Sequence, residues 1–302
     1  MNIHQSCRRR CQIRLLLQGP SGSGKTMSAL LIAHGLAAGH WPKIVVIDSE
    51  NGSAELYADL GAYNVLTLSP PYTPERYVQA IEACELAGME VIIIDSMTHC
   101  WEYLLDYHAG LPGNSFTAWG KVTPRHTAFV NRILRSPAHV IATVRSKTEY
   151  VLSEKNGRQV PEKVGMKIIQ REGIDYEFSV VLELDLRNNA TASKDRTQLF
   201  REQPAFRPGQ STGESLRSWC EQGSPTKWEQ IHQVIKKCQN LDEMASLYYS
   251  LSSAEQAEFR PAFQDQKQHL QAVALAPSSL GNNQLFIQPN PTLNHGNLTH
   301  SA

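Results

Sequence analysis

The feature that most constrains the fold is an octet at residues 19–26, which reads Gly-Pro-Ser-Gly-Ser-Gly-Lys-Thr. It has the form G-x-x-x-x-G-K-[ST], in which a glycine-rich turn wraps its backbone N–H groups around a phosphate. An apolar run, Ile13 to Leu17, precedes the octet, and a helical pattern, Met27 to Ala38, follows it. This order of strand, loop and helix predicts a phosphate-binding P-loop, because the helix places its positive N-terminal end at the phosphate.

The octet also predicts the ligands of the site, which are ATP and Mg²⁺. Lys25 is expected to reach the β- and γ-phosphates, and the Thr26 hydroxyl is expected to coordinate Mg²⁺. The residues expected to surround the phosphates are Gly19, Pro20, Ser21, Gly22, Ser23, Gly24, Lys25 and Thr26.

Two further apolar runs end in acidic residues. Residues 91–95 read Val-Ile-Ile-Ile-Asp, the form of a Walker B strand, so Asp95 is expected to hold the Mg²⁺ shell. The run at residues 44–47 continues into Asp48 and Glu50. A carboxylate just beyond such a strand can orient the attacking water or take its proton, and Glu50 is the candidate catalytic base. Asp48 is the alternative base, and a capping role for Glu50 stays open.

Strand-like runs alternate with helical stretches as far as residue 186, which predicts an α/β fold with a mostly parallel sheet covered by helices. The predicted strands are Ile13–Leu17, Lys43–Asp48, Val65–Leu68, Val91–Asp95, His139–Val144 and Glu177–Leu186. Thr73-Pro74 and Thr123-Pro124 each have the form of a helix start, with an N-cap followed by proline. Residues 148–172 contain turn residues and predict a long loop or a hairpin.

Beyond the sheet pattern the chain predicts short helices and then a tail. The predicted helices are Glu214–Gln222, Lys227–Gln239, Leu241–Leu251 and Ala254–Ala274. The domain prediction is therefore a basic N-terminal segment over 1–11, an ATPase domain over 12–209, a helical C-terminal region over 210–276 and a disordered tail over 277–302.

Composition restricts the class of protein and its surroundings. The apolar fraction of 41% and the charged fraction of 19% suit a globular protein, and no apolar run approaches the roughly 18 residues of a membrane span. The six cysteines form no zinc pattern and predict reduced thiols. We therefore expect a cytoplasmic protein without a membrane segment.

The order of these motifs resembles the RecA-type recombinase core. In that family the glutamate after the second strand is the catalytic carboxylate, which implies that role for Glu50. The resemblance also places a γ-phosphate sensor at Thr143, where an amide is usual. Lys194 and Arg196 match two basic residues that reach the ATP of a neighbouring subunit. A ring or filament of identical subunits is thereby implied.

A closer similarity, over residues 12–222, is to phage and prophage ATPases of the AAA, RecA-like type. The similar segments are Asp48-Ser-Glu-Asn-Gly52, Lys163-Val-Gly-Met-Lys167, Gln170-Arg-Glu-Gly-Ile-Asp-Tyr-Glu-Phe178 and Ala192-Ser-Lys-Asp-Arg-Thr197. Proteins of this kind are often linked to single-strand annealing or recombination, so the resemblance implies a role in DNA recombination, annealing or repair.

The net charge of the chain is zero, but residues 145–171 hold seven Lys and Arg against three Glu. Such a run can track the phosphate backbone of single-stranded DNA, and it can equally be a solvated loop. The candidate DNA-binding residues are Arg145, Lys147, Lys155, Arg158, Lys163 and Lys167. The aromatic residues between positions 101 and 119 can stack on bases or pack helices over the sheet.

The sequence thus predicts a RecA-like ATP hydrolase that acts on single-stranded DNA. One alternative is an ATP-switched adaptor that loads a phage replication or recombination protein through the C-terminal helices, without binding DNA. A small-molecule or nucleotide kinase is disfavoured, because no arginine-rich lid lies near a second substrate site.

Overall fold

The computed structural model describes residues 5–155, 158–225 and 227–275, and their side chains outside residues 148–166 and 272–275. The chain divides into two compact units, Met1–Thr226 and Lys227–Ala302. The first unit holds the sheet and its covering helices, and the described residues of the second form three further helices.

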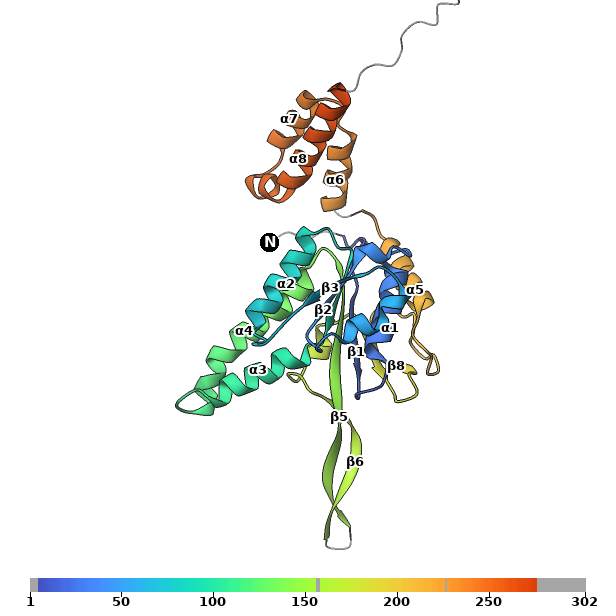
Figure 1. Ribbon diagram of the computed structural model, residues 1–302, viewed down its shortest axis with the longest axis vertical. Helices are drawn as coiled ribbons and strands as arrows, with labels where there is room; N and C mark the ends of the chain where they lie inside the picture. Colours follow the sequence, from blue (N-terminus) through green and yellow to red (C-terminus); the bar gives the residue numbers. More distant parts are fainter. Residues whose placement is uncertain (1–4, 156–157, 226, 276–302) are drawn as a thin grey trace, which may run out of the picture. The chain divides into compact units, whose positions relative to one another are not determined.

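The centre of the first unit is a mostly parallel sheet with strand order β3-β2-β4-β5-β1-β7-β8 (Figure 1). Strands β1, β2, β3, β4, β5 and β7 run parallel, β8 is antiparallel to β7, and β6 pairs antiparallel with β5. This arrangement confirms the predicted α/β class. The strands are β1 (Arg14–Gly19), β2 (Ile44–Asp48), β3 (Asn64–Thr67), β4 (Val91–Asp95), β5 (His139–Lys155), β6 (Arg158–Ile168), β7 (Val180–Leu184) and β8 (Ala190–Asp195).

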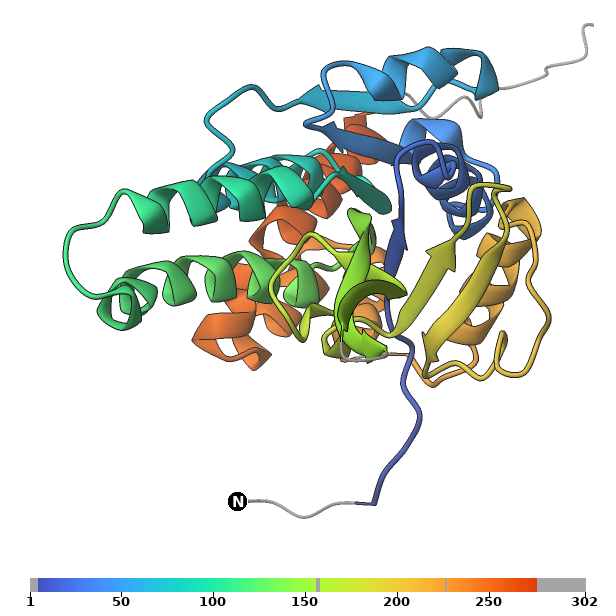
Figure 2. The ribbon, with the colours of Figure 1, turned by 90° about the horizontal axis from the view of Figure 1, so that it is seen from below.

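Helices cover both faces of this sheet. The α-helices of the first unit are α1 (Lys25–Leu36), α2 (Pro74–Leu86), α3 (Thr98–Ala109), α4 (Ser115–Arg135) and α5 (Gln210–Glu221). The 3₁₀ helices are η1 (Trp41–Lys43), η2 (Ser53–Leu60) and η3 (Ile174–Tyr176). Helices α1 and α5 pack on one face and α2 and α4 on the other, while α3 lies beside α4 (Figure 2).

The central strands are apolar on both sides because both sides are covered. In β1, Leu15 and Leu17 pack into the core under α1, whereas Leu16 packs into the core under α2 and α4. All three are fully buried. A strand buried in this way reads as a continuous apolar run, which is why the sequence reveals β1, β2 and β4.

Several predicted elements differ from the structure. The prediction that a helix begins at Thr123-Pro124 is wrong, because α4 begins at Ser115 after the Asn114 N-cap and Pro124 lies inside it. Proline lacks the N–H that would bond the carbonyl of Gly120, so a mid-helix proline reads like a helix start. The predicted strand Glu177–Leu186 is shorter, and β7 covers only Val180–Leu184.

The basic stretch after residue 145 forms the hairpin that the turn residues predict as one of two alternatives. Strand β5 continues past the sheet edge and pairs with β6 from Ser146 opposite Ile168 to Lys155 opposite Arg158 (Figure 1). We call residues 146–168 the β5–β6 hairpin.

The second unit consists of α6 (Lys227–Lys237), α7 (Leu241–Ser250) and α8 (Ser253–Leu275). These helices lie close to the predicted ranges. Their shared core contains Ile235, Met244, Phe259 and Phe263, all of them buried. The predicted tail, 277–302, lies outside the described residues.

Helix α5 belongs to the first unit, whereas the sequence pattern predicts it to be part of the C-terminal helical region, 210–276. It crosses α1 at two glycines, Gly35 and Gly213. A Cβ atom on Gly213 would lie 2.0 Å from the carbonyl oxygen of Ile32, and one on Gly35 would lie 2.1 Å from that of Gln210. The two backbones can meet this closely only because neither position carries a side chain.

We expect Gly213→Ala to lower the free energy of unfolding by about 1–3 kcal/mol, because the new methyl group overpacks the crossing of α1 and α5. Urea denaturation measures the change. Gly120→Ala in α4 is the matched control, since nothing lies within 4 Å of its Cβ position. The control should be neutral or stabilise by up to about 1 kcal/mol. Equal effects of the two substitutions would contradict the close crossing.

Candidate functional site

The octet at residues 19–26 forms a turn between the end of β1 and the start of α1. Gly24 has φ 77°, a left-handed conformation that favours glycine. A Cβ atom there would also lie 2.7 Å from the side-chain nitrogen of Asn188. The first N–H groups of α1 have no partners within the helix, so this turn offers donors to an anion.

Lys25 is the first residue of α1 and turns back over the octet. Its Nζ donates to the carbonyl oxygens of Gly19, at 3.0 Å, and Pro20, at 2.8 Å. Burial lowers its pKa, and the nearby carboxylates of Asp95 and Glu50 oppose that shift. The ammonium group therefore lies in a partly desolvated position that favours an anionic partner.

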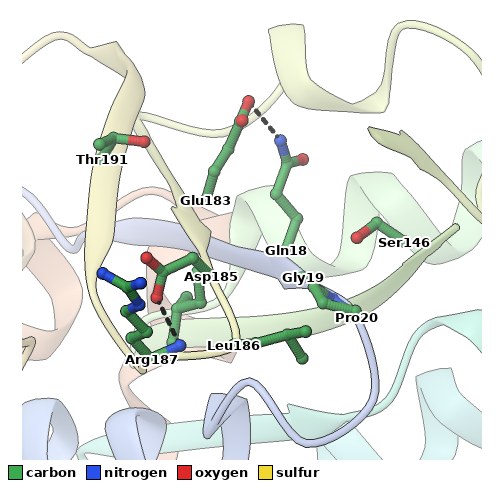
Figure 3. A pocket seen from close by; sticks show the side chains of 10 residues that line it. Gln18, Gly19, Pro20, Ser146, Glu183, Asp185, Leu186, Arg187 and Thr191 are labelled. Atoms are coloured by element: carbon green, nitrogen blue, oxygen red, sulfur yellow. Dashed lines mark hydrogen bonds between the residues drawn. The ribbon is translucent and has the colours of Figure 1, made fainter. Parts of the chain in front are cut away.

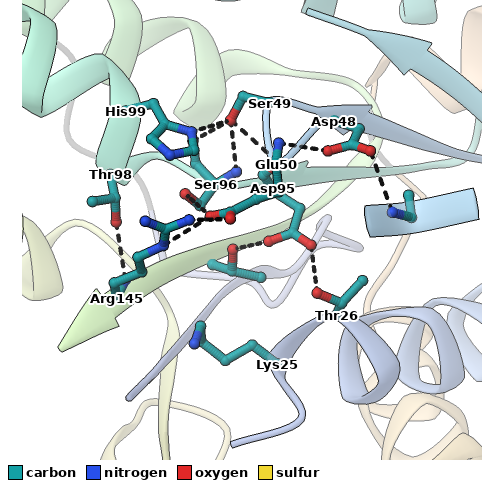
Figure 4. A network of polar contacts seen from close by, with 12 residues as sticks. Lys25, Thr26, Asp48, Ser49, Glu50, Asp95, Ser96, Thr98, His99 and Arg145 are labelled. Atoms are coloured by element: carbon teal, nitrogen blue, oxygen red, sulfur yellow. Dashed lines mark hydrogen bonds and ion pairs between the residues drawn. The ribbon is translucent and has the colours of Figure 1, made fainter. Parts of the chain in front are cut away.

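Asp95 ends β4 and lies between two threonine hydroxyls. Thr26 Oγ1 donates to Asp95 Oδ2 at 2.6 Å (Figure 4). Thr143 Oγ1 donates to Asp95 Oδ1. The Asp95 side chain is almost fully buried. Burial raises the pKa of this carboxyl, against the two hydroxyl bonds that lower it.

These oxygens fit a magnesium ion. Mg²⁺ prefers oxygen ligands and is commonly held by one or two carboxylates together with substrate phosphates and water. The Thr26 hydroxyl and the Asp95 carboxylate supply such oxygens beside the octet. Within the described residues, no group of three or more His, Cys, Asp or Glu side chains gathers around a common point. A metal here would therefore depend on the substrate for further ligands.

Asp48 supports the turn after β2. Its Oδ1 accepts from the backbone N–H of Glu50 at 2.6 Å, and its Oδ2 accepts from that of Ala54 at 3.2 Å. Asp48 is fully buried. Both of its carboxylate oxygens are therefore used to fix the backbone that carries Glu50.

Glu50 projects toward the ends of β4 and β5, where three donors meet its carboxylate. Ser96 Oγ donates to Oε1 at 2.9 Å, Arg145 Nε donates to Oε1 at 3.0 Å, and Arg145 Nη2 donates to Oε2 (Figure 4). Burial alone would raise the pKa of Glu50, but the bonds from Arg145 and Ser96 outweigh it and lower the pKa.

His99 belongs to the framework behind this carboxylate. Its Nδ1 lies 3.0 Å from Ser49 Oγ, and its ring stacks on Tyr72 with centroids 5.0 Å apart. The Ser49 hydroxyl in turn lies within hydrogen-bond distance of the backbone at Asp95 and Ser96. This network joins the ends of β2 and β4.

A cavity of about 510 Å³ opens beside the first residues of the octet (Figure 3). Strands β1 and β7 meet along it, where Gln18 Nε2 donates to Glu183 Oε1 at 2.8 Å. Gly19, Pro20, Ser146 and Leu186 also line it. The cavity therefore connects the octet with the base of the β5–β6 hairpin.

Lys194 and Arg196 lie elsewhere. The register of β7 and β8 puts Lys194 opposite Val181, near the start of β7, whereas the octet follows the far end of β1. Lys194 Nζ donates to the carbonyl oxygens of Asp175 and Tyr176, and Arg196 Nη2 donates to that of Tyr176. These two cations are not part of the site within one subunit.

The candidate DNA-binding residues separate into two groups. Arg145 is bound to Glu50 inside the site. Lys147 and Lys167 are exposed and lie directly opposite each other at the base of the β5–β6 hairpin. Lys155, Arg158 and Lys163 occupy positions in β5 and β6, and their side chains lie outside the described part of the structure.

The aromatic residues after position 100 mainly pack α3 against α4. Trp101 stacks on Trp119 with ring centroids 5.9 Å apart, and Trp119 also stacks on His108. Phe116 differs, with 84% of its side chain exposed.

Sequence reasoning missed the partners of Glu50. The alternation of a strand offers a signal for Arg145, because Thr143 and Arg145 are two residues apart and lie on the same face. No sequence pattern indicates Ser96, which reaches Glu50 only because β2 and β4 are neighbours with Asp48 opposite Asp95.

A model of the AAA domain family matches residues 12–210. The chain therefore belongs to this family and carries an AAA-type P-loop ATPase domain, for which ATP binding and hydrolysis are the general activity. No curated protein sequence matches the chain. Among the described helices, none combines the length and the apolar character that crossing a membrane requires.

We expect Asp95→Asn to stabilise the protein without nucleotide by about 1 kcal/mol at pH 8. Burial raises the pKa of Asp95 in the folded state. The protonated carboxyl group therefore contributes stability at low pH, and this contribution is lost as the pH rises through the pKa of the folded state. The gain should therefore be smaller at pH 5. Urea denaturation in EDTA at both pH values measures it.

The control for this prediction is Asp59→Asn, at an exposed position of η2. It should change stability by less than about 0.5 kcal/mol at either pH. A loss of stability in Asp95→Asn that is equal at pH 5 and pH 8 would contradict the assigned cost of burying the carboxylate.

Proposed function

We propose that this protein is a RecA-like ATP hydrolase of phage or prophage type that acts on single-stranded DNA in recombination, annealing or repair. The observation that carries the proposal is the meeting of Lys25, Thr26, Asp95 and Glu50 at the carboxyl edge of the sheet. Open α/β sheets bind their ligands at this edge.

Each residue has a role that follows from its chemistry. The octet and Lys25 bind the phosphates, and Thr26 and Asp95 hold Mg²⁺, which neutralises charge on the β- and γ-phosphate oxygens when bound. Glu50 orients a water and accepts its proton as the water oxygen bonds to the γ-phosphorus. The bond from that phosphorus to the bridging oxygen breaks, and ADP leaves with the electron pair.

The β5–β6 hairpin supports the DNA part of the proposal. Its register sets Lys147 opposite Lys167, and both of these side chains are exposed. The backbone register also pairs position 155, a lysine, with position 158, an arginine. Like charges directly opposite one another in a hairpin are destabilising, and a polyanion such as a nucleic-acid backbone relieves the repulsion.

The positions of Lys194 and Arg196 support a role between subunits. They lie toward the opposite end of β7 from the octet, so neither serves the nucleotide of its own subunit. In a ring or filament they would complete the site of a neighbour, where a cation stabilises the charge on the transferred phosphoryl group.

A second candidate function is an ATP-switched adaptor that loads a phage replication or recombination protein. It is favoured by the second unit, whose helices α6–α8 have a core of their own and leave Tyr249 80% exposed beside a groove of about 330 Å³. An adaptor would hydrolyse ATP at a rate indifferent to DNA.

We expect Lys25→Ala to weaken ATP binding by at least about tenfold, because a charge-assisted bond to the phosphates is lost. Glu50→Gln should bind ATP at least as tightly as the wild type and lose hydrolysis by about 100-fold or more, since an amide cannot accept the proton. Fluorescent-nucleotide titration and phosphate release measure the two properties. Undiminished hydrolysis by Glu50→Gln would contradict the assigned base.

Single-stranded DNA should stimulate ATP hydrolysis at low salt, and the stimulation should fall steeply by roughly 200 mM salt. A double variant, Lys147→Gln with Lys167→Gln, should bind DNA more weakly and lower the slope of log K against log salt by about 1–2. Fluorescence anisotropy at several salt concentrations measures the slope.

The matched control for the DNA prediction is Lys121→Gln, which removes an exposed cation from α4. It should bind DNA as the wild type does. Wild-type hydrolysis that ignores DNA at every salt concentration would contradict the DNA role and favour the adaptor.

A further inference from the structure

We propose that Arg145 restrains Glu50 until ATP binds, and that its guanidinium then moves to the γ-phosphate and leaves Glu50 able to accept a proton. The inference deepens the proposed function and rests on it. It assigns Arg145 to the control of hydrolysis in place of contact with DNA.

The first support is the contact itself. Arg145 forms a bidentate ion pair with the two carboxylate oxygens of Glu50. Ser96 Oγ is a further donor and bonds Oε1. Paired donors of this kind form strong bonds to a carboxylate and occupy its lone pairs. A carboxylate held in this way is a poor base, so Glu50 must leave Arg145 before it can act on water.

The second support is the position of Arg145 beside the phosphate-binding turn. In the pairing of β1 with β5, Arg145 lies opposite Gly19, the first residue of the octet. Burial is the main cause of the lowered pKa of Lys25, and the positive charge of Arg145 lowers it further. The two cations are therefore close enough to act on each other electrostatically. A γ-phosphate bound by Lys25 would therefore also be attracted by the charge of Arg145.

The third support is the difference between the two partners of the guanidinium. A terminal phosphate carries more negative charge than a carboxylate and accepts the same planar fork of N–H donors. ATP therefore offers Arg145 a stronger partner than Glu50. ADP lacks the γ-phosphate and offers no such exchange.

The fourth support is that the backbone of Arg145 is fixed while its side chain is only half-buried. Its N–H donates to Thr98 Oγ1 at 2.9 Å, and its carbonyl accepts from the N–H of Ile169 at 2.7 Å. The exchange we propose therefore moves the side chain of Arg145 and leaves its backbone in place. Arg145 also directly precedes Ser146, where the β5–β6 hairpin begins.

Thr143, two residues before Arg145 in β5, has a different partner. The Thr143 hydroxyl donates to Asp95 and is committed to that carboxylate. Arg145 is the next residue of β5 on the same face and has the longer reach.

The test compares the affinities of a non-hydrolysable ATP analogue and of ADP, both with Mg²⁺, in the full chain. We expect Arg145→Gln to weaken the ATP analogue by about tenfold, the effect of losing a charge-assisted bond, and to leave ADP unchanged. Arg145→Lys keeps the positive charge but lacks the planar pair of N–H donors. Its affinity for the ATP analogue should lie between those of the wild type and Arg145→Gln. Arg135→Gln is the control, since exposed Arg135 ends α4 before β5 begins, at the opposite sheet edge.

A second readout is the pH dependence of kcat/KM, which reports the free enzyme. Loss of the Arg145 bonds raises the pKa of Glu50, so the acid limb of Arg145→Gln should move to higher pH. His99, Lys25 and Asp95 also act on Glu50 electrostatically, and all three are retained in this variant.

The outcomes separate the inference from the function beneath it. Equal weakening of both nucleotides in Arg145→Gln, or an unchanged preference for the ATP analogue, would overturn the exchange even if hydrolysis persisted. If the wild-type protein never hydrolysed ATP, both the proposed hydrolase function and the restraint on Glu50 would be wrong. The ratio of the affinities for the ATP analogue and ADP would still decide whether Arg145 contacts the γ-phosphate.

Discussion

The arrangement of the site depends on one buried carboxylate. Asp95 is held by hydroxyls from two different elements, Thr26 at the start of α1 and Thr143 in β5. These bonds connect the start of α1, directly after the octet, with strands β4 and β5. Burial of the carboxyl group opposes folding at neutral pH, and the surrounding core compensates for that cost. At the candidate site, a buried carboxylate is thus kept at a cost in folding stability.

The parts of the fold that follow from local rules could be predicted from the sequence. The strands β1, β2 and β4 are buried on both faces and read as apolar runs, and the octet between β1 and α1 has a motif of its own. The start of α4 could not be predicted, because Pro124 inside the helix imitates a helix start. The crossing of α1 and α5 through Gly35 and Gly213 depends on tertiary packing that no local pattern records.

The candidate site likewise has residues that the sequence could predict and residues that it could not. Lys25, Thr26, Asp95 and Glu50 could be placed from motifs at strand ends, since parallel strands bring those ends together. Their partners could not be placed. The pairing of Arg145 with Glu50 joins residues 95 positions apart, and the sequence around Arg145 reads as a basic stretch suited to DNA. Arg145 lies opposite Gly19 of the octet and directly before the β5–β6 hairpin, so one residue connects those two regions.

The ends of the first unit have a consequence for how the protein can be divided. Backbone bonds join Arg10 to Ser224 and Cys11 to Cys220, so the segment before β1 lies along the segment that closes α5. Leu216 and Cys220 of α5 complete the core under α1. A protein cut to residues 12–210, the span that the family model matches, would lack both closing segments and would expose apolar surface of α1. We therefore expect the smallest piece able to fold alone to be longer than residues 12–210 and to include the segments on either side.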